Sequence, residues 1–128
     1  MSAPRVAIVV LNWNGWRDTL ACIASLQNVT YSDFHIVLVD NGSTDESMLH
    51  FQLEIPSVEL LQTGANLGFG GGCNVGIRHA LAQGAEFVWL INSDATVDPS
   101  ALSALVRLAD QYPAVGAVGS VLFDAGAV

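Results

Sequence analysis

The sequence contains no lysine. Its four basic residues are all arginines, Arg5, Arg17, Arg78 and Arg107, and they face 12 aspartates and glutamates, so the formal net charge is −8 at pH 7. The absence of lysine excludes a phosphate-binding loop of the Gly-Lys-Ser/Thr type and Schiff-base chemistry. Because nucleic-acid binding needs a basic surface, no nucleic-acid partner is expected. A ligand that carries phosphates would need a divalent cation to offset its charge.

Long apolar runs and a cysteine framework are also missing. The longest aliphatic run, Val6–Leu11, is far shorter than the ~20 residues that cross a bilayer, and residues 1–5 do not resemble a signal peptide. The expected location is therefore cytoplasmic, either free or peripheral to the inner face of the plasma membrane. Cys22 and Cys73 lack the spacing of metal ligands and are expected to be buried free thiols.

Strand and helix patterns alternate along the chain. Apolar runs rich in β-branched residues predict buried strands at residues 5–11, 35–39, 58–61, 86–91 and 114–122. Helical patterns lie between them, around residues 16–24, from Ser43 to before Pro56, over 73–81 and over 99–111. With 128 residues, 52% of them hydrophobic, the chain is long enough for one domain with a core. The alternation predicts an α/β fold with a mainly parallel sheet and right-handed crossovers.

A glycine-rich stretch at residues 63–76 follows the third expected strand. We expect it to form a loop that lets the backbone approach a ligand closely, and the alternative is a flexible loop without a ligand. It does not match the G-x-G-x-x-G dinucleotide fingerprint. Starting at Gly68, the last position is Cys73, and starting at Gly70, it is Val75.

Polar residues stand where three apolar runs stop. These are Asn12, Asp40-Asn41 and Asn92-Ser93-Asp94. Since parallel strands share one carboxyl edge, which is where open α/β sheets bind ligands, these residues and the glycine stretch are expected to meet at one rim. Asp40 and Asn41 are suited to read a base or a ribose, and Asp94 is suited to hold a hard cation. The alternative for Asp94 is a side chain that only shapes its turn.

Four motifs in this order resemble those of family 2 glycosyltransferases. They are the first strand running into Leu11-Asn12-Trp13-Asn14, then Val39–Asp45, then Asn66–Gly76, and finally Leu90–Asp94. The glycine run after Asn66-Leu67-Gly68-Phe69 is most similar to the rhamnosyltransferase-type branch. The resemblance implies the GT-A fold, a Rossmann-like α/β/α sandwich, and a reaction that inverts the anomeric centre.

The resemblance also implies ligands. The donor would be a nucleotide-diphospho-sugar, with dTDP-rhamnose as one candidate, the metal Mg²⁺ or Mn²⁺, and the acceptor a polysaccharide or a lipid-linked glycan. Asp40 would bind the base, with Leu11 and Trp13 near it, and Asp94 would be the metal-binding carboxylate of a D-x-D motif whose first position here is Asn92. The full set expected to bind the donor is Leu11, Asn12, Trp13, Asp40, Asn41, Asn66, Gly70, Asn74, Asn92 and Ser93.

In this family the general base and most acceptor contacts lie in a later half. Residues 1–128 are therefore expected to form the donor-binding domain of a longer enzyme, inactive alone and prone to self-association through an uncovered apolar face. A nucleotide-sugar binding module without catalysis is the first alternative. A dinucleotide-dependent oxidoreductase is the second, and the failed glycine fingerprint disfavours it.

Overall fold

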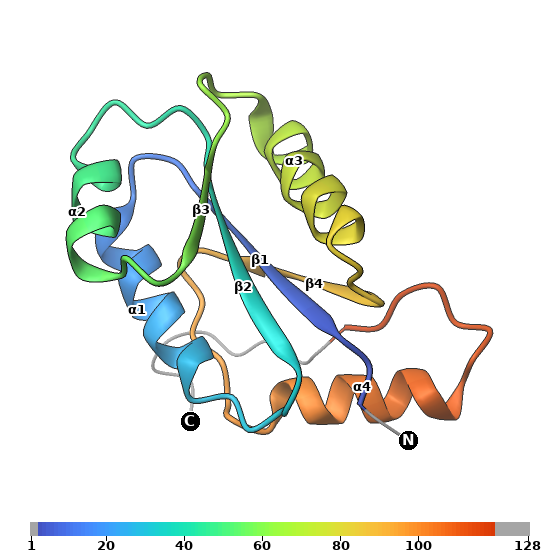
Figure 1. Cartoon of the computed structure of the whole chain (residues 1–128). Helices are drawn as coiled ribbons and strands as arrows, with labels where there is room; N and C mark the ends of the chain where they lie inside the picture. Colours follow the sequence, from blue (N-terminus) through green and yellow to red (C-terminus); the bar gives the residue numbers. More distant parts are fainter. Residues whose placement is uncertain (1–2, 120–128) are drawn as a thin grey trace.

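Four strands alternate with four helices in the computed structural model, which describes residues 3–119 (Figure 1). In chain order they are β1 Val6–Asn12, α1 Trp16–Gln27, β2 Phe34–Asp40, α2 Ser47–Glu54, β3 Glu59–Gln62, α3 Gly68–Ala82, β4 Phe87–Asn92 and α4 Ala101–Gln111.

The strands form one sheet in the order β3-β2-β1-β4, and every neighbouring pair is parallel. The chain moves outward from β1 to β3 and then returns through α3 to place β4 on the other side of β1. Strand order thus reverses between β1 and β4, which is the position where open α/β sheets bind ligands. The register sets Asn12 beside Asp40 and Leu11 beside Asn92.

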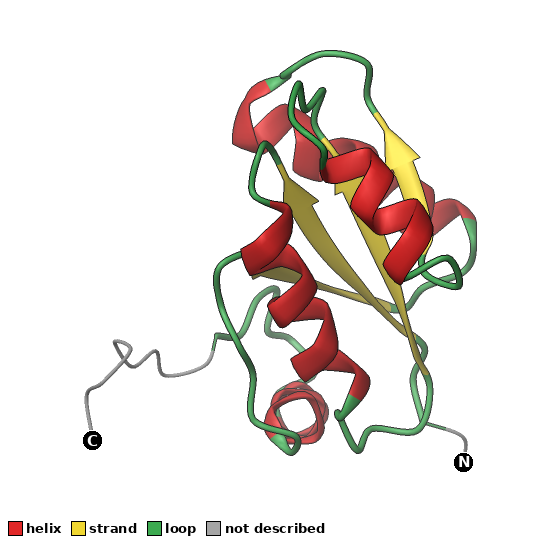
Figure 2. Ribbon diagram, turned by 90° about the vertical axis from the view of Figure 1, so that its left-hand side faces the viewer, coloured by secondary structure: helices red, strands yellow, loops and turns green. Residues whose placement is uncertain are grey.

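Helices cover both faces of the sheet, because alternate side chains of β1 point in opposite directions. Val6, Ile8 and Val10 belong to a core that also contains buried residues of α1, α2 and α4. Ala7 and Val9 lie on the other face, which α3 covers. Figure 1 shows α1 and α2 on one side of the strands and α3 on the other, and Figure 2 shows the helices packed around the yellow strands. The predicted α/β/α sandwich is confirmed.

The glycine stretch is a loop only up to Leu67, because α3 begins at Gly68. The helix expected over 73–81 is confirmed, but it begins five residues earlier than predicted. Gly70 and Asn74 are therefore helical residues. A Cβ at Gly72 would lie 2.6 Å from Leu11 Cδ1, and one at Gly76 would lie 2.6 Å from Val9 Cγ1. These two glycines allow α3 to lie directly on β1, so close packing offsets the ~0.5–1 kcal/mol that glycine costs a helix.

Three other predicted boundaries also differ from the structure. The helix expected from Ser43 begins at Ser47, because Ser43 bonds to Asp40 instead. The helix expected over 99–111 begins at Ala101, because Asp98 accepts hydrogen bonds from Ser100 in the turn before it. Residues 114–119 are not in a strand, and the rest of the strand expected at 114–122 lies outside the described residues.

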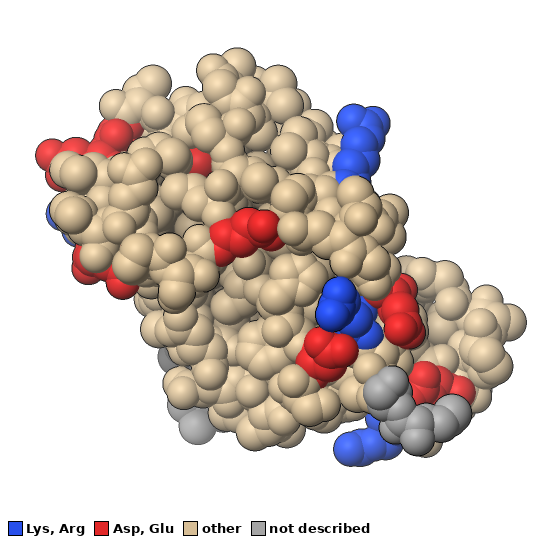
Figure 3. Space-filling model, viewed as in Figure 1, with Lys and Arg blue, Asp and Glu red and all other residues tan. Residues whose placement is uncertain are grey.

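The surface carries few charges. Figure 3 shows separate aspartates and glutamates, and a few arginines, on a mainly uncharged face. Within residues 3–119, no helix is long and apolar enough to cross a membrane. Cys22 and Cys73 are free and buried, as predicted.

Candidate functional site

Asp40, the last residue of β2, is the centre of a buried polar network. Its side chain is fully buried. Oδ1 accepts hydrogen bonds from Asn12 Nδ2 at 2.9 Å and Ser43 Oγ at 2.7 Å, and Oδ2 accepts from Ser43 N at 3.0 Å and Gln62 Nε2 at 2.8 Å. All of these donors are neutral. Hydrogen bonds to the charged form therefore replace the water that burial removes.

Asn12 is held in place from the opposite side. It is also fully buried, and its Oδ1 accepts a 2.6 Å hydrogen bond from Thr19 Oγ1 of α1. Because the amide oxygen is engaged by this hydroxyl, the amide nitrogen is the end that faces Asp40. The sequence expectation that Asn12 and Asp40 meet at the carboxyl edge is therefore borne out by the register and by a direct bond.

Asn14 ties the loop after β1 to the loop after β2. Its φ is 52°, a left-handed value that asparagine adopts more readily than most residues. In this conformation Asn14 Oδ1 accepts from Thr44 N at 2.8 Å and Asp45 N at 3.1 Å, while its own N–H donates to Ser43 Oγ at 2.9 Å. The two loops that frame the network are thereby fixed to each other.

Asn41 links the network to the start of α3. It is 2% exposed, and its Oδ1 accepts from Leu67 N at 3.1 Å and Thr63 Oγ1 at 3.2 Å. Its Nδ2 donates to Gly68 O at 3.0 Å and to Asn66 Oδ1 at 3.3 Å. Asn41 thus satisfies its amide with protein partners and positions the first turn of α3.

Asn92, Ser93 and Asp94, which the sequence predicted as site residues, lie at the end of β4 and just after it. Asn92 and Asp94 are exposed, and Ser93 is half-buried. Cys22 Sγ contacts the carbonyl oxygen of Asn92 at 3.7 Å. Burial, and secondarily the charge of Asp94, raise the pKa of Cys22 to about 11. Asp94 therefore lies close enough to α1 to act electrostatically on it.

The donor set at the end of β4 suits a hard cation shared with a ligand. Among the described residues, no cluster of three or more His, Cys, Asp or Glu side chains could hold a metal by itself. Asp94 and Asn92 offer one carboxylate and one amide, both exposed. Mg²⁺ commonly uses one or two carboxylates and takes its remaining ligands from water and substrate phosphates.

The remaining predicted residues lie at the surface or under α3. Trp13 is 53% exposed, and Gly70 and Asn74 lie on the exposed side of α3. Leu11 is half-buried and packs against α3 at Gly72. The structure thus joins Asn12, Asp40, Asn41 and Asn66 by hydrogen bonds, but it records no side-chain bond from them to Asn92, Ser93 or Asp94.

Sequence reasoning missed five members of the network: Asn14, Thr19, Ser43, Gln62 and Thr63. Only Gln62 could have been found from a pattern in the sequence. Gln62 is the last residue of β3 and lies beside Asp40 in the register. The rule that selected Asn12, Asp40 and Asn92, a polar residue at the end of a strand, also selects Gln62.

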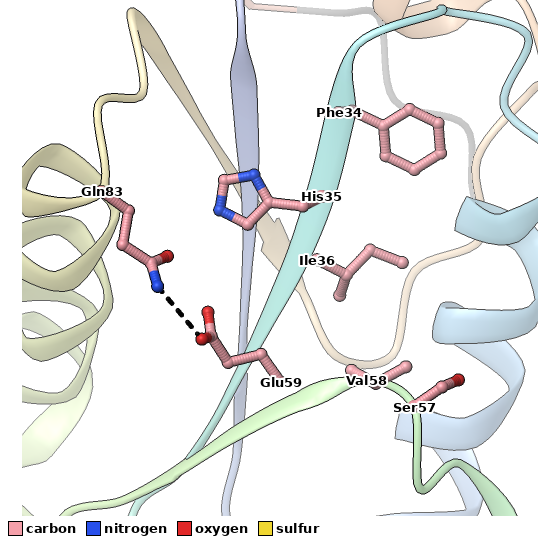
Figure 4. A pocket seen from close by; sticks show the side chains of 7 residues that line it. All are labelled: Phe34, His35, Ile36, Ser57, Val58, Glu59 and Gln83. Atoms are coloured by element: carbon pink, nitrogen blue, oxygen red, sulfur yellow. Dashed lines mark hydrogen bonds between the residues drawn. The ribbon is translucent and has the colours of Figure 1, made fainter.

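A hollow lies at the amino edge of the sheet, away from the polar network. It is lined by Phe34, His35, Ile36, Ser57, Val58, Glu59 and Gln83 (Figure 4). Phe34 and Glu59 are the first residues of β2 and β3, so this hollow is at the amino edge and is separate from the polar network. Its one drawn hydrogen bond joins Gln83 Nε2 to Glu59 Oε2 at 3.2 Å.

A parallel sheet whose strand order reverses between β1 and β4 defines an open, doubly wound α/β domain, a class in which ligands bind at the carboxyl edge of the strands. The comparisons then identify the family. The sequence model described as Glycosyl transferase family 2 matches residues 7–127, and the chain belongs to this family.

Curated relatives agree with this assignment. The chain is 36% identical over 114 residues to the N-acetylglucosaminyl-diphospho-decaprenol L-rhamnosyltransferase of Mycobacterium tuberculosis, covering 80% of this chain and 36% of the relative. It is 35% identical over 81 residues to the galactofuranosyltransferase GlfT1 of the same organism, covering 61% and 27%. The matched part therefore spans about a third of the length of the rhamnosyltransferase and about a quarter of that of the galactofuranosyltransferase.

Solved structures share the fold. The mannosyltransferase PcManGT from Pyrobaculum calidifontis, in complex with GDP-Man and Mn²⁺, superposes with a TM-score of 0.74 at 22% identity, covering 93% of this chain and 35% of that one. S. aureus TarS 1–349 in complex with UDP gives 0.73 at 20% identity, covering 92% and 38%. The GT-A fold is confirmed.

Proposed function

We propose that this chain binds the nucleotide-diphospho-sugar donor of an inverting glycosyltransferase at the carboxyl edge of its sheet. The observation that carries the proposal is the network around Asp40, in which the end residues of β1, β2 and β3 converge on one buried carboxylate. The name of the rhamnosyltransferase relative supports rhamnose as the sugar, and we propose dTDP-rhamnose as the donor. The UDP and GDP-Man complexes of the structural neighbours support a nucleotide-linked sugar.

Each part of the site has a proposed role. Asp40 accepts a hydrogen bond from the base, and the exposed ring of Trp13 stacks beside it. Asn41 and Asn66 fix the start of α3, so that Gly70 and Asn74 line the pocket beside the sugar. Binding at this rim orients the donor, and transfer additionally needs a base that deprotonates the acceptor hydroxyl. We place that base outside residues 1–128.

The residues present fit a divalent metal. Asp94, with Asn92 beside it, would hold Mg²⁺ or Mn²⁺ against the diphosphate. The bound ion would supply charge neutralisation that a chain without lysine and with a net charge of −8 does not supply itself.

A titration of dTDP, UDP and GDP with and without Mn²⁺ tests the proposal. We expect Mn²⁺ to raise the affinity of the wild type by about tenfold or more, which corresponds to ~1.4 kcal/mol. Asp94→Ala removes this metal effect while preserving the fold, because an exposed carboxylate packs against little. Asp110→Ala is the matched control, since Asp110 is an exposed carboxylate on α4. Equal affinities with and without metal would show that the metal role is wrong.

The alternative is a nucleotide-sugar binding module with no catalysis of its own. It is favoured by the same hydrogen-bond network, which organises binding without supplying a general base. Slow release of free sugar from the bound donor, lost in Asp94→Ala, would favour the transferase. Tight binding without any release would favour the module.

The acceptor and the location are proposed from the relative. A transferase named for a lipid-linked N-acetylglucosaminyl-diphospho-decaprenol acceptor supports a lipid-linked or polysaccharide acceptor for this chain. Such an acceptor would place the enzyme at the cytoplasmic face of a membrane as a peripheral protein.

A further inference from the structure

Gln62 fills the position beside Asp40 with three hydrogen bonds. Its Nε2 donates to Asp40 Oδ2 at 2.8 Å, and its Oε1 accepts from Gly42 N at 3.1 Å and Gly64 N at 2.9 Å. The opposite orientation of the Gln62 amide would set its oxygen against the Asp40 carboxylate and its NH₂ against two backbone N–H groups. Both contacts would be repulsive, so the hydrogen-bond partners determine the amide orientation. Of the three residues that donate to the Asp40 carboxylate, Gln62 alone is exposed.

The two backbone N–H groups that donate to Gln62 Oε1 both belong to glycines. Gly42 has a φ of +76° and Gly64 a φ of +85°, which are values that favour glycine. A Cβ at Gly42 would lie 2.5 Å from the carbonyl carbon of Ala65, so no other residue fits there. The result is a position where two N–H groups converge on one oxygen, directly beside a buried carboxylate acceptor.

The polar groups that surround Gln62 define what else could bind in its place. A replacement must present an N–H to Asp40 and, next to it, an acceptor with two lone pairs for Gly42 and Gly64. The lactam edge of uracil, thymine or guanine carries this N–H and C=O pair. The corresponding ring nitrogen of adenine or cytosine has one lone pair and can satisfy only one of the two N–H groups.

We infer that Gln62 is a placeholder for the base: its carboxamide occupies the base position in the free protein and is displaced by the lactam edge of the donor. This inference rests on the proposed function, and it makes Gln62 a residue that sets both affinity and base choice. In the bound state Asp40, Gly42 and Gly64 keep their hydrogen bonds, with the base as the new partner.

If the base displaces Gln62, truncating Gln62 should raise the affinity for the nucleotide rather than lower it. A nucleotide that binds only when Gln62 has moved away binds with an affinity reduced by the fraction of molecules in that open state. Gln62→Ala removes the competitor. If the open fraction is roughly 10–30%, the variant binds a lactam-base nucleotide about three- to tenfold more tightly than the wild type. A residue that merely supports the pocket would weaken binding when it is truncated.

Calorimetric titrations of UDP, dTDP, GDP, ADP and CDP into the wild type, Gln62→Ala and Gln62→Met test the inference. Gln62→Met retains the length of the side chain without its polar atoms. Gln83→Ala is the matched control, because Gln83 is also an exposed glutamine that donates to a carboxylate, Glu59, at the amino edge. We expect tighter binding of UDP, dTDP and GDP in both Gln62 variants, weak binding of ADP and CDP throughout, and no change in Gln83→Ala.

The outcomes separate this inference from the proposed function. Unchanged or weaker UDP, dTDP and GDP binding in both Gln62 variants overturns the placeholder and leaves donor binding intact. No nucleotide binding by the wild type or either variant overturns both. If the variants do not fold, the ¹⁵N side-chain amide signal of Gln62 in the wild type decides the question. It moves to a solvent-exposed position at saturating UDP if Gln62 is displaced, and an unchanged signal overturns the inference.

Discussion

Asp40 combines complete burial with four hydrogen bonds from neutral donors, so its removal has two separate consequences. Asp40→Ala leaves the donors from Asn12, Ser43 and Gln62 without their acceptor. Because hydrogen bonds to a charged group are worth ~1.5–3 kcal/mol and stranded buried donors carry a further cost, we expect the free energy of unfolding to fall by about 2–4 kcal/mol. Urea denaturation measures this loss.

Nucleotide affinity should fall in the same variant, by ~1–3 kcal/mol if the base hydrogen-bonds to Asp40. The loss should be the same with and without Mn²⁺, since Asp40 is not the proposed metal ligand. Asp110→Ala serves as the control for charge. A folded Asp40→Ala protein that binds UDP or dTDP as tightly as the wild type would remove Asp40 from the base site.

Cys22 gives the chain a pH-dependent stability. In the unfolded chain its thiol ionises near pH 8.5, whereas burial, helped by the charge of Asp94, raises its pKa in the folded protein to about 11. The stabilisation is therefore fully present below about pH 8.5 and is lost as the pH rises toward 11. The difference in unfolding free energy between wild type and Cys22→Ala should narrow as the pH rises from about 8.5 toward 11. A constant difference would contradict the assignment.

Single residues were predictable where an apolar run stops at a polar side chain. Asn12, Asp40 and Asn92 are the last residues of β1, β2 and β4, as their sequence context indicates. The partners that hold Asp40 were not predictable in the same way. Ser43 bonds to Asp40 because the intervening loop turns back on the strand, and Thr19 reaches Asn12 only when α1 is docked. Such contacts depend on tertiary geometry.

At the scale of elements, α3 shows that glycine content alone can wrongly predict a loop where the structure has a helix. A stretch with glycine at positions 68, 70, 71, 72 and 76 has poor helix propensity, so the sequence favoured a loop. The structure has a helix there because the absence of side chains lets α3 approach β1 and β2. Tertiary packing outweighs local propensity, and only knowledge of the sheet surface under the helix would have revealed this.

Two glycines of α3 should therefore respond oppositely to alanine. At Gly76 a Cβ would lie 2.6 Å from Val9 Cγ1 and 3.0 Å from Val39 Cγ2, and we expect Gly76→Ala to lower the unfolding free energy by ~1–3 kcal/mol through overpacking. At Gly70 nothing lies within 4 Å of the added atom. Gly70→Ala should raise the unfolding free energy by up to ~1 kcal/mol, because alanine is the better helix former. Urea denaturation of both variants checks the pair.

Equal effects at the two positions would contradict the packing argument. Nucleotide binding should also be measured in Gly70→Ala, since Gly70 is proposed to line the donor pocket. A variant that is more stable yet binds UDP or dTDP less tightly would support a surface role for Gly70 in binding. The two readouts separate helix stability from ligand contact.

At the scale of the whole molecule, the parallel sheet and its helical layers were predictable from the order of apolar runs, because strand–helix alternation leaves few topologies open. The strand order β3-β2-β1-β4 was not deduced. It depends on α3 crossing to the opposite face of the sheet, and the pattern of α3 does not indicate which face it covers. This crossing creates the switch point at which the candidate site lies.

β4 is an edge strand of the sheet and has solvent-exposed apolar side chains. Among residues 3–119, no strand pairs with the outer edge of β4, where Phe87 is 38% and Leu90 is 44% exposed. Unpaired edges and uncovered apolar surface favour association with another chain. We predict that this 128-residue chain self-associates in solution, as measured by light scattering over a dilution series. Leu90→Lys should reduce the association, because a charge on an edge strand opposes pairing.

The same chain should not transfer sugar by itself. It presents a site suited to the donor, but transfer requires a base for the acceptor hydroxyl, which we place outside these residues. Slow hydrolysis of the donor can persist, because a water molecule can attack the donor sugar without a base positioned for an acceptor hydroxyl. An assay with dTDP-rhamnose, Mn²⁺ and a panel of lipid-linked and polysaccharide acceptors tests this. A monomer that transfers sugar at an ordinary enzymatic rate of ~1–1000 per second would refute both the self-association and the placement of the general base.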